Sequence, residues 1–205
     1  MRRDEPLTIE WIAQTRHEIH DTAIEVVQEA VARGGSRLKE VPRPISDIAV
    51  VLGSRVVKAP DRLLRGNRGL CTEREILVVQ SDDDRHWVQR FTIAHELGHQ
   101  WLGPKAPEWE CNAFSASTLI PDDDVRTFLE RRNVTRPATL EEWAHREIRG
   151  AVVSHLVRRY GVGYHAMIRA LADYGFVAGI APWTSQAYGD ALYESYEYYY
   201  RHLDQ

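Results

Sequence analysis

Residues 90–102 read RFTIAHELGHQWL, and the rest of the chain is organised around this stretch. Residues four apart lie on the same face of an α-helix, so His95 and His99 can direct two imidazole nitrogens at one ion. Glu96 follows His95 directly and is close enough to reach a water molecule on that ion without being a ligand. This is the spacing of the H-E-x-x-H pattern, in which two histidines hold zinc and the glutamate acts as general base.

The alternative is a solvated helix face that carries two histidines by accident, and the neighbours of the pair argue against it. Apolar side chains form a seam beside the histidines, which predicts a half-buried helix. They are Ala94, Leu97, Trp101 and Leu102. Gly98 costs about 1 kcal/mol relative to alanine inside a helix, so another backbone is expected to pass close to it. We therefore interpret the pattern as a metal site.

The composition is that of an ordinary globular protein. The chain has 205 residues, of which 43% are hydrophobic and 27% charged, enough for one domain with or without a small module. A net charge of −4 indicates no general affinity for nucleic acid or for anionic membranes. Two cysteines, Cys71 and Cys111, are too few for a disulfide framework. The first residues contain no apolar region of the kind found in signal peptides. No run approaches the roughly 18 apolar residues that a membrane-spanning helix needs. We expect a cytoplasmic protein.

The region before the histidine helix predicts an α+β fold. Apolar residues recur at helical spacing between residues 8 and 33, and a glycine pair ends this long helix. A short helix and three strands are expected next, with the strands forming a small sheet against which the histidine helix packs. The expected ranges are 45–52 for the helix and 55–59, 69–72 and 75–80 for the strands. The last strand is almost continuously apolar, as in strands buried on both faces.

A third protein ligand is expected after the histidine helix, because zinc sites of this kind use three protein ligands and leave one position for water or substrate. Gly103-Pro104 ends the histidine helix, and a further helix is expected from about residue 107 to Pro121. Glu110 is our first choice for the ligand and Glu108 its rival, since periodicity does not separate the two. Cys111 is a weaker candidate, because a buried cysteine is more often a small apolar residue. Both glutamates also fit an ordinary acidic first helical turn.

The sequence RFTIAHELGH at 90–99, followed by E-C-N-x-F-x-A-x-x-L-I-P from Glu110 to Pro121, resembles the ImmA/IrrE family of zinc metallopeptidases. The resemblance covers roughly residues 45–121 and weakens up to about 177. It implies that His95 and His99 are zinc ligands, that Glu96 is the catalytic base, and that Glu110 rather than Glu108 is the third ligand. Cys111 stands where the family has alanine, and the connection between the two helices is short. That connection borders the cleft, so it bears on substrate preference.

The resemblance also implies a minimal zincin-like fold with a long N-terminal helix, a three-stranded sheet, the H-E-x-x-H helix and the glutamate helix. We expect this domain over residues 1–137, a helix-turn-helix-like segment over 138–180 and an acidic, tyrosine-rich tail over 181–205. The tail fits either a docked helix or a partner-binding segment.

Two helices of the C-terminal part, expected at 151–160 and 164–174 around a glycine-containing turn, have a helix-turn-helix pattern. A DNA-reading helix presents basic or amide side chains near its start, but the second helix offers only Tyr164, His165 and Arg169. Arg158 and Arg159 add little. A packing unit is therefore favoured over DNA binding. Tyr164 and His165 are also the candidates for stabilising an oxyanion.

The function that the resemblance implies is a zinc metallo-endopeptidase acting on a specific protein, typically an Xre-type repressor. The alternative is a non-proteolytic regulator, or a toxin, whose zinc domain and C-terminal helices bind an Xre-like antitoxin, a transcription factor or DNA. His/His/Glu ligation favours Zn²⁺ over other metals.

Overall fold

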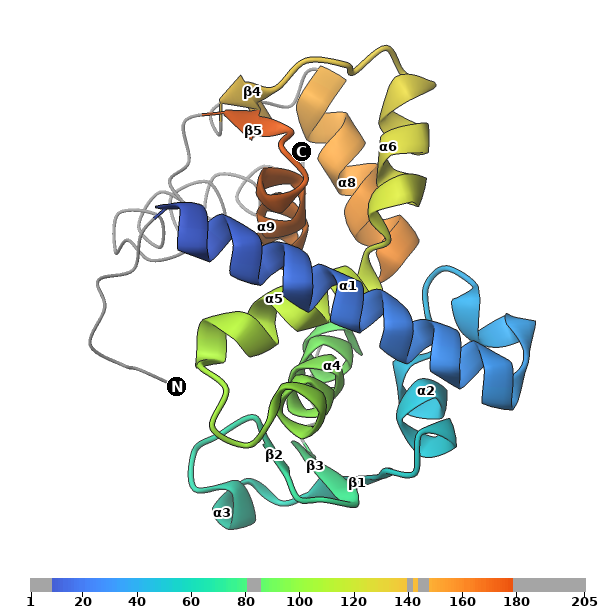
Figure 1. The fold of residues 1–205 in the computed structure, drawn as a ribbon, viewed down its shortest axis with the longest axis vertical. Coiled ribbons are helices and arrows are strands. Elements are labelled where there is room, and N and C mark those ends of the chain that lie inside the picture. The colour runs from blue at the N-terminus through green and yellow to red at the C-terminus, as the bar shows by residue number, and fades with distance from the viewer. Residues whose placement is uncertain (1–8, 81–85, 140–141, 144–147, 179–205) are drawn as a thin grey trace.

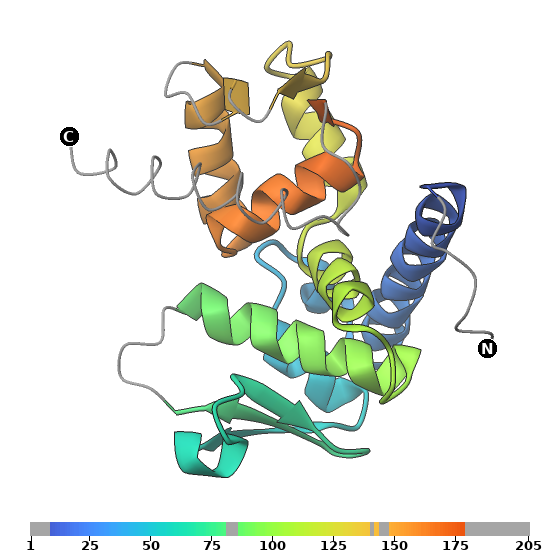
Figure 2. The same cartoon turned by 90° about the vertical axis from the view of Figure 1, so that its left-hand side faces the viewer.

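Helix α4, His86–Leu102, carries the histidine pattern and lies between a small sheet and helix α5, Glu108–Leu119 (Figures 1 and 2). The structure is a computed structural model that describes residues 9–80, 86–139, 142–143 and 148–178. The buried side of α4 is apolar, with Ile93, Ala94 and Leu97 in the core. The helix ends at Gly103, whose φ of +108° is a backbone conformation that glycine adopts readily.

The sheet has three strands, and its edge strand β2 lies beside α4 (Figure 2). The strands are β1 (Arg55–Ala59), β2 (Gly69–Cys71) and β3 (Glu75–Val79). Strand β3 is central, parallel to β1 and antiparallel to β2. Its burial alternates, with Ile76 and Val78 buried and the residues between them half-buried. The expectation that this strand is buried on both faces is therefore wrong, because α2 and α4 cover only one face of the sheet.

The long helix α1, Ile9–Gly34, packs across α5, and the short helix α2, Ile45–Val51, packs on α4 and β1 (Figure 1). A 3-10 turn, η1, joins α1 to α2 at Ser36–Lys39, and a one-turn helix α3, Asp61–Leu64, joins β1 to β2. These elements agree with the predicted α+β architecture and with the expected order of helix, sheet, histidine helix and glutamate helix.

The remaining elements form the upper part of Figure 1 and continue the same hydrophobic core. They are α6 (Asp122–Glu130), β4 (Ala138–Thr139), α8 (Ile148–Tyr160), α9 (Tyr164–Asp173) and β5 (Val177–Ala178). Strands β4 and β5 pair in parallel, and α9 packs on α5 and α8. Every residue of α9 is buried or half-buried. The domain boundaries at 137 and 180 stay predictions, and the tyrosine-rich tail lies outside the described residues.

Helices α4 and α5 approach each other closely at Gly98, as the sequence predicts. A Cβ atom at Gly98 would lie 3.1 Å from Phe114 Cδ1 and 3.3 Å from Cys111 Cα. The missing side chain lets the α5 backbone reach the face of α4 that carries the histidines. Among the described helices, none is long and apolar enough to cross a membrane.

Candidate metal centre

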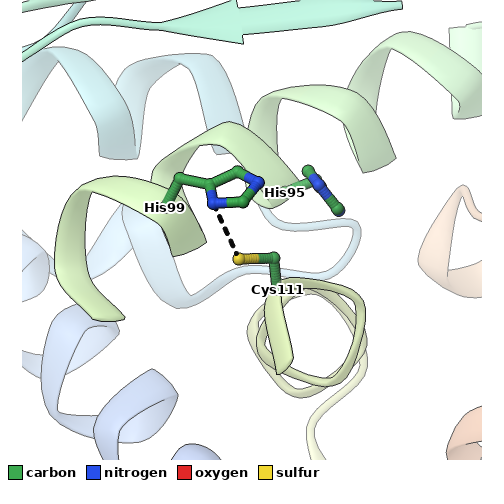
Figure 3. Close-up of side chains that lie close together, drawn as sticks. All are labelled: His95, His99 and Cys111. Carbon is green, nitrogen blue, oxygen red and sulfur yellow. Dashed lines mark hydrogen bonds between the residues drawn. The ribbon is translucent and has the colours of Figure 1, made fainter. Parts of the chain in front are cut away.

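His95 and His99 lie side by side on α4, one helical turn apart (Figure 3). Their ring centroids are 4.9 Å apart, with the planes inclined at 73°. Each side chain is 14% exposed, so both rings are largely shielded but reachable from solvent. The helical spacing therefore places the two imidazoles as the sequence predicts, facing the same space.

Glu108, the first residue of α5, brings a carboxylate to this pair. Its Oε2 atom lies 3.0 Å from His95 Nε2, and its Oε1 atom lies 3.5 Å from His99 Nε2. Two imidazole nitrogens and a carboxylate thus converge, and this is the donor set that a three-ligand zinc site uses. The residues present fit a zinc ion.

Glu110, which the resemblance implies as the third ligand, is placed differently. Helical residues are 100° apart around the axis, so Glu110 is rotated by about 200° from Glu108. Within the described part of the chain, Glu110 makes no ion pair or hydrogen bond with either histidine. Burial raises the pKa of its carboxyl group. The structure therefore brings Glu108, and not Glu110, to the histidines.

Two further residues of α5 contact the histidines on the side away from Glu108. His95 Nδ1 lies 3.0 Å from Asn112 Oδ1. His99 Nδ1 lies 3.2 Å from Cys111 Sγ, as Figure 3 shows. The sequence alone indicates no role for Asn112 and makes Cys111 only a weak ligand candidate. The signal was present, because positions 108, 111 and 112 have the i, i+3, i+4 spacing of one helix face.

Cys111 is also close enough to be considered as a ligand. One donor atom from each of His95, His99 and Cys111 can be chosen so that all lie within 4.8 Å of one another. The sulfur, however, lies beside Nδ1 of His99, whereas the Nε2 atoms of both rings face Glu108. Sulfur and carboxylate therefore lie at opposite nitrogens of the His99 ring.

Glu96 lies next to the pair on α4 and is 8% exposed. Burial raises the pKa of its carboxyl group, and the two histidines and Cys71 oppose that shift. A carboxyl group with a raised pKa can accept a proton and return it during a reaction at neutral pH. Glu96 is thus placed for acid–base chemistry beside the histidines.

Strand β2 covers Glu96 from the other side. A Cβ atom on Gly69 would lie 2.6 Å from Glu96 Oε1 and 2.5 Å from Thr92 Cγ2, so a larger residue there would have to displace one of these side chains. Burial, followed by the charge of Glu96, raises the pKa of the Cys71 thiol to about 11.

A cleft of about 500 Å³ opens over these groups. Its walls include His95, Glu96 and His99 of α4, Glu108 and Asn112 of α5, and residues 67–71, which comprise β2 and the two residues before it. Tyr164 and His165, the candidates for stabilising an oxyanion, are not among the residues that line this cleft. Tyr164 is fully buried in the core.

Comparison with known proteins adds one finding. A protein-family model described as the IrrE N-terminal-like domain matches residues 50–172, which is more than half of the 205-residue chain. The match includes the sheet, both site helices and most of the C-terminal helices. No curated protein matches the sequence.

Proposed function

The chain belongs to the Peptidase_M78 family of IrrE N-terminal-like domains, and on that premise we propose that it is a zinc-dependent endopeptidase whose metal ion is held by His95, His99 and Glu108. The observation that carries this proposal is the convergence of two Nε2 atoms and one carboxylate in the cleft, with Glu96 beside them. The donor set and the neighbouring buried carboxyl group are the two parts that metal-assisted peptide hydrolysis requires.

A zinc ion bound here would polarise the substrate carbonyl and lower the pKa of water. Glu96 would accept the proton of the attacking water and then donate it to the nitrogen of the departing amine. The new C–O bond forms first, and the C–N bond then breaks as the amine nitrogen receives the proton that Glu96 took from the water. The close approach of the Gly69 backbone to the Glu96 carboxylate would help to hold that group in place for both transfers.

The substrate backbone is proposed to lie along β2. Strand β2 pairs with β3 on one side, and among the described strands no other pairs with its second side. That free edge borders the cleft, because all of β2 is part of the cleft wall. An extended peptide can add to such an edge through main-chain hydrogen bonds, which would carry its scissile bond past Glu96. An extended, locally unfolded segment of a protein is the substrate that this arrangement suits.

The family resemblance supports a specific protein substrate, an Xre-type transcriptional repressor, in preference to general degradation. The experiment incubates the purified wild type and Glu96→Gln with an Xre-type repressor encoded by an adjacent gene. Casein serves as the control substrate. We expect the wild type to cut the repressor at one site and Glu96→Gln to leave it intact while still binding zinc. Equal cleavage by both proteins would overturn the assignment of Glu96, and cleavage of casein alone would overturn the choice of substrate.

The alternative of a DNA-binding or antitoxin-binding regulator has less support. No residue of α9 is fully exposed, although this helix would have to enter the major groove. Arg159 makes two contacts of 2.9 Å to the Asp124 carboxylate, which engages the guanidinium within the protein. The C-terminal helices are better suited to completing the core around α5.

A further inference from the structure

Helix α5 contributes three side chains to the face that meets the histidines, those of Glu108, Cys111 and Asn112. Only Glu108 belongs to the proposed ligand set. We propose that the other two, Asn112 and Cys111, are positioning residues that hold His95 and His99 with Nε2 directed at the metal. This inference rests on the proposed zinc site and extends it to the groups that orient its ligands.

The argument begins with the chemistry of imidazole. A neutral ring has one protonated nitrogen and one nitrogen with a free lone pair, and only the latter can bind a metal. The hydrogen bond at one nitrogen therefore decides whether the other is ready to be a ligand. In both rings the nitrogen that faces Glu108 is Nε2, so both protons must be held at Nδ1.

Asn112 meets this requirement for His95. Its Oδ1 atom, 3.0 Å from Nδ1, is an amide oxygen and can only accept a hydrogen bond, so Nδ1–H is the donor. The lone pair is then on Nε2, on the Glu108 side of the ring. Asn112 also lines the cleft, so its exchange for a smaller residue leaves no sealed cavity in the core.

Cys111 occupies the corresponding position beside His99. Its sulfur lies 3.2 Å from Nδ1 and the residue is fully buried, which keeps water from competing for that nitrogen. Its place is fixed from two directions. The Ser115 hydroxyl donates a 2.7 Å hydrogen bond to the Cys111 carbonyl, and Gly98 gives the Cys111 backbone its close approach to α4.

The two contacts differ in strength. An amide oxygen is a good acceptor, whereas sulfur is a weak one. The orientation of His95 should therefore depend more on Asn112 than that of His99 depends on Cys111. Losing a hydrogen-bond partner of a metal ligand typically weakens metal binding by about 10–100-fold, and the larger effect belongs to Asn112.

The test is zinc affinity, measured by competition with a chromophoric chelator on the full chain. Asn112→Ala should bind zinc about 10–100-fold more weakly than the wild type, and Asn112→Asp, which keeps an acceptor oxygen, should recover most of that loss. Glu110→Gln, on the same turn of α5, is the matched control and should bind like the wild type. Thermal unfolding in excess chelator shows that the variants fold.

Cobalt substitution tests Cys111 separately. If the sulfur only orients His99, cobalt-loaded wild type should lack an intense sulfur-to-cobalt charge-transfer band, and Cys111→Ser should leave the visible spectrum unchanged. A charge-transfer band that disappears in Cys111→Ser would make Cys111 a ligand and overturn its assignment.

The remaining outcomes separate the two proposals. Wild-type zinc affinity in folded Asn112→Ala would overturn the inference while the zinc site stands. A wild type that binds no zinc would overturn the proposed function, and with it the inference that rests on it.

Discussion

The backbone of Gly69 on strand β2 lies directly against the carboxylate of Glu96 on helix α4. A Cβ atom at position 69 would come within 2.6 Å of Glu96 Oε1, closer than real Cβ atoms approach any heavy atom. The edge strand and the proposed catalytic base can therefore lie this close only because position 69 has no side chain. This contact has a direct consequence for activity.

Gly69→Ala should lower peptidase activity by about tenfold or more while zinc affinity stays near that of the wild type. The added methyl group must displace Glu96 or Thr92, and a shift of the base that costs about 1.4 kcal/mol in the transition state is a tenfold change in rate. The measurement is kcat/KM on the repressor, alongside chelator competition. Unchanged kcat/KM would show that β2 does not constrain Glu96.

Glu108→Gln and Glu110→Gln should differ sharply in zinc affinity. Glu108 directs its carboxylate at both Nε2 atoms, so its loss removes a ligand and should weaken zinc binding by more than about 100-fold. Glu110 has no described contact with either histidine, and its substitution should leave affinity within about twofold. The two variants change the same functional group, two residues apart. The reverse order of affinities would restore Glu110 as the third ligand.

Arg90→Ala should destabilise the fold without touching the metal-facing side of α4. Arg90 is 7% exposed, and its guanidinium donates hydrogen bonds to the carbonyls of Gly161, at 3.0 Å, and Tyr160, at 3.2 Å, at the end of α8. Leaving these carbonyls unpaired should cost about 2–4 kcal/mol of the free energy of unfolding, because hydrogen bonds to charged groups are strong and the site is buried. Urea denaturation measures the loss.

The control for that variant is Arg74→Ala, since Arg74 is exposed and should change the free energy of unfolding by less than about 0.5 kcal/mol. If both substitutions changed the free energy of unfolding equally, the contact of Arg90 with the end of α8 would not contribute to stability.

Asp173→Asn should make stability less sensitive to pH between about 4 and 7. Burial raises the pKa of Asp173 to about 7, although Arg16 lies 2.9 Å away and opposes the shift. Because the folded pKa lies above the unfolded one, the contribution of this group to stability is greatest at low pH. It is lost as pH rises toward 7, by at most about 1.4 kcal/mol per pH unit.

Asparagine stays neutral throughout, so the variant should gain stability relative to the wild type as pH rises from about 4 to 7. The measurement is the difference in urea midpoint between the two proteins at several pH values. A difference that does not vary with pH would show that Asp173 ionises normally in the folded protein.

Much of the fold and part of the site follow from local pattern. The i, i+4 spacing places His95 and His99 on one face of α4 wherever that helix packs, and glycine at 98 correctly predicts the close approach of α5. The three strands appear within about a residue of their expected ranges. These features depend on periodicity and turn residues, which the sequence displays directly.

The third ligand and the cover over Glu96 depend instead on how elements turn toward each other. Periodicity left Glu108 and Glu110 open, and the choice of Glu110 came from the family pattern. The rotation of α5 is set by its contact with Gly98 through Cys111 and Phe114, and that rotation turns Glu108 toward the histidines. The Gly69 contact likewise joins two elements distant in sequence, so no local signal reveals it.

The close connection between α4 and α5 has a consequence for how the centre assembles. The three proposed ligands and both orienting side chains all lie between residues 95 and 112, on two helices joined by a short turn. Loop-closure entropy grows with the length of chain between contacts, so bringing these groups together costs little compared with a site collected from distant segments. The contacts of the metal centre therefore have a short sequence separation and can form early in folding. The contact between β2 and Glu96 closes a longer loop and is expected to form later.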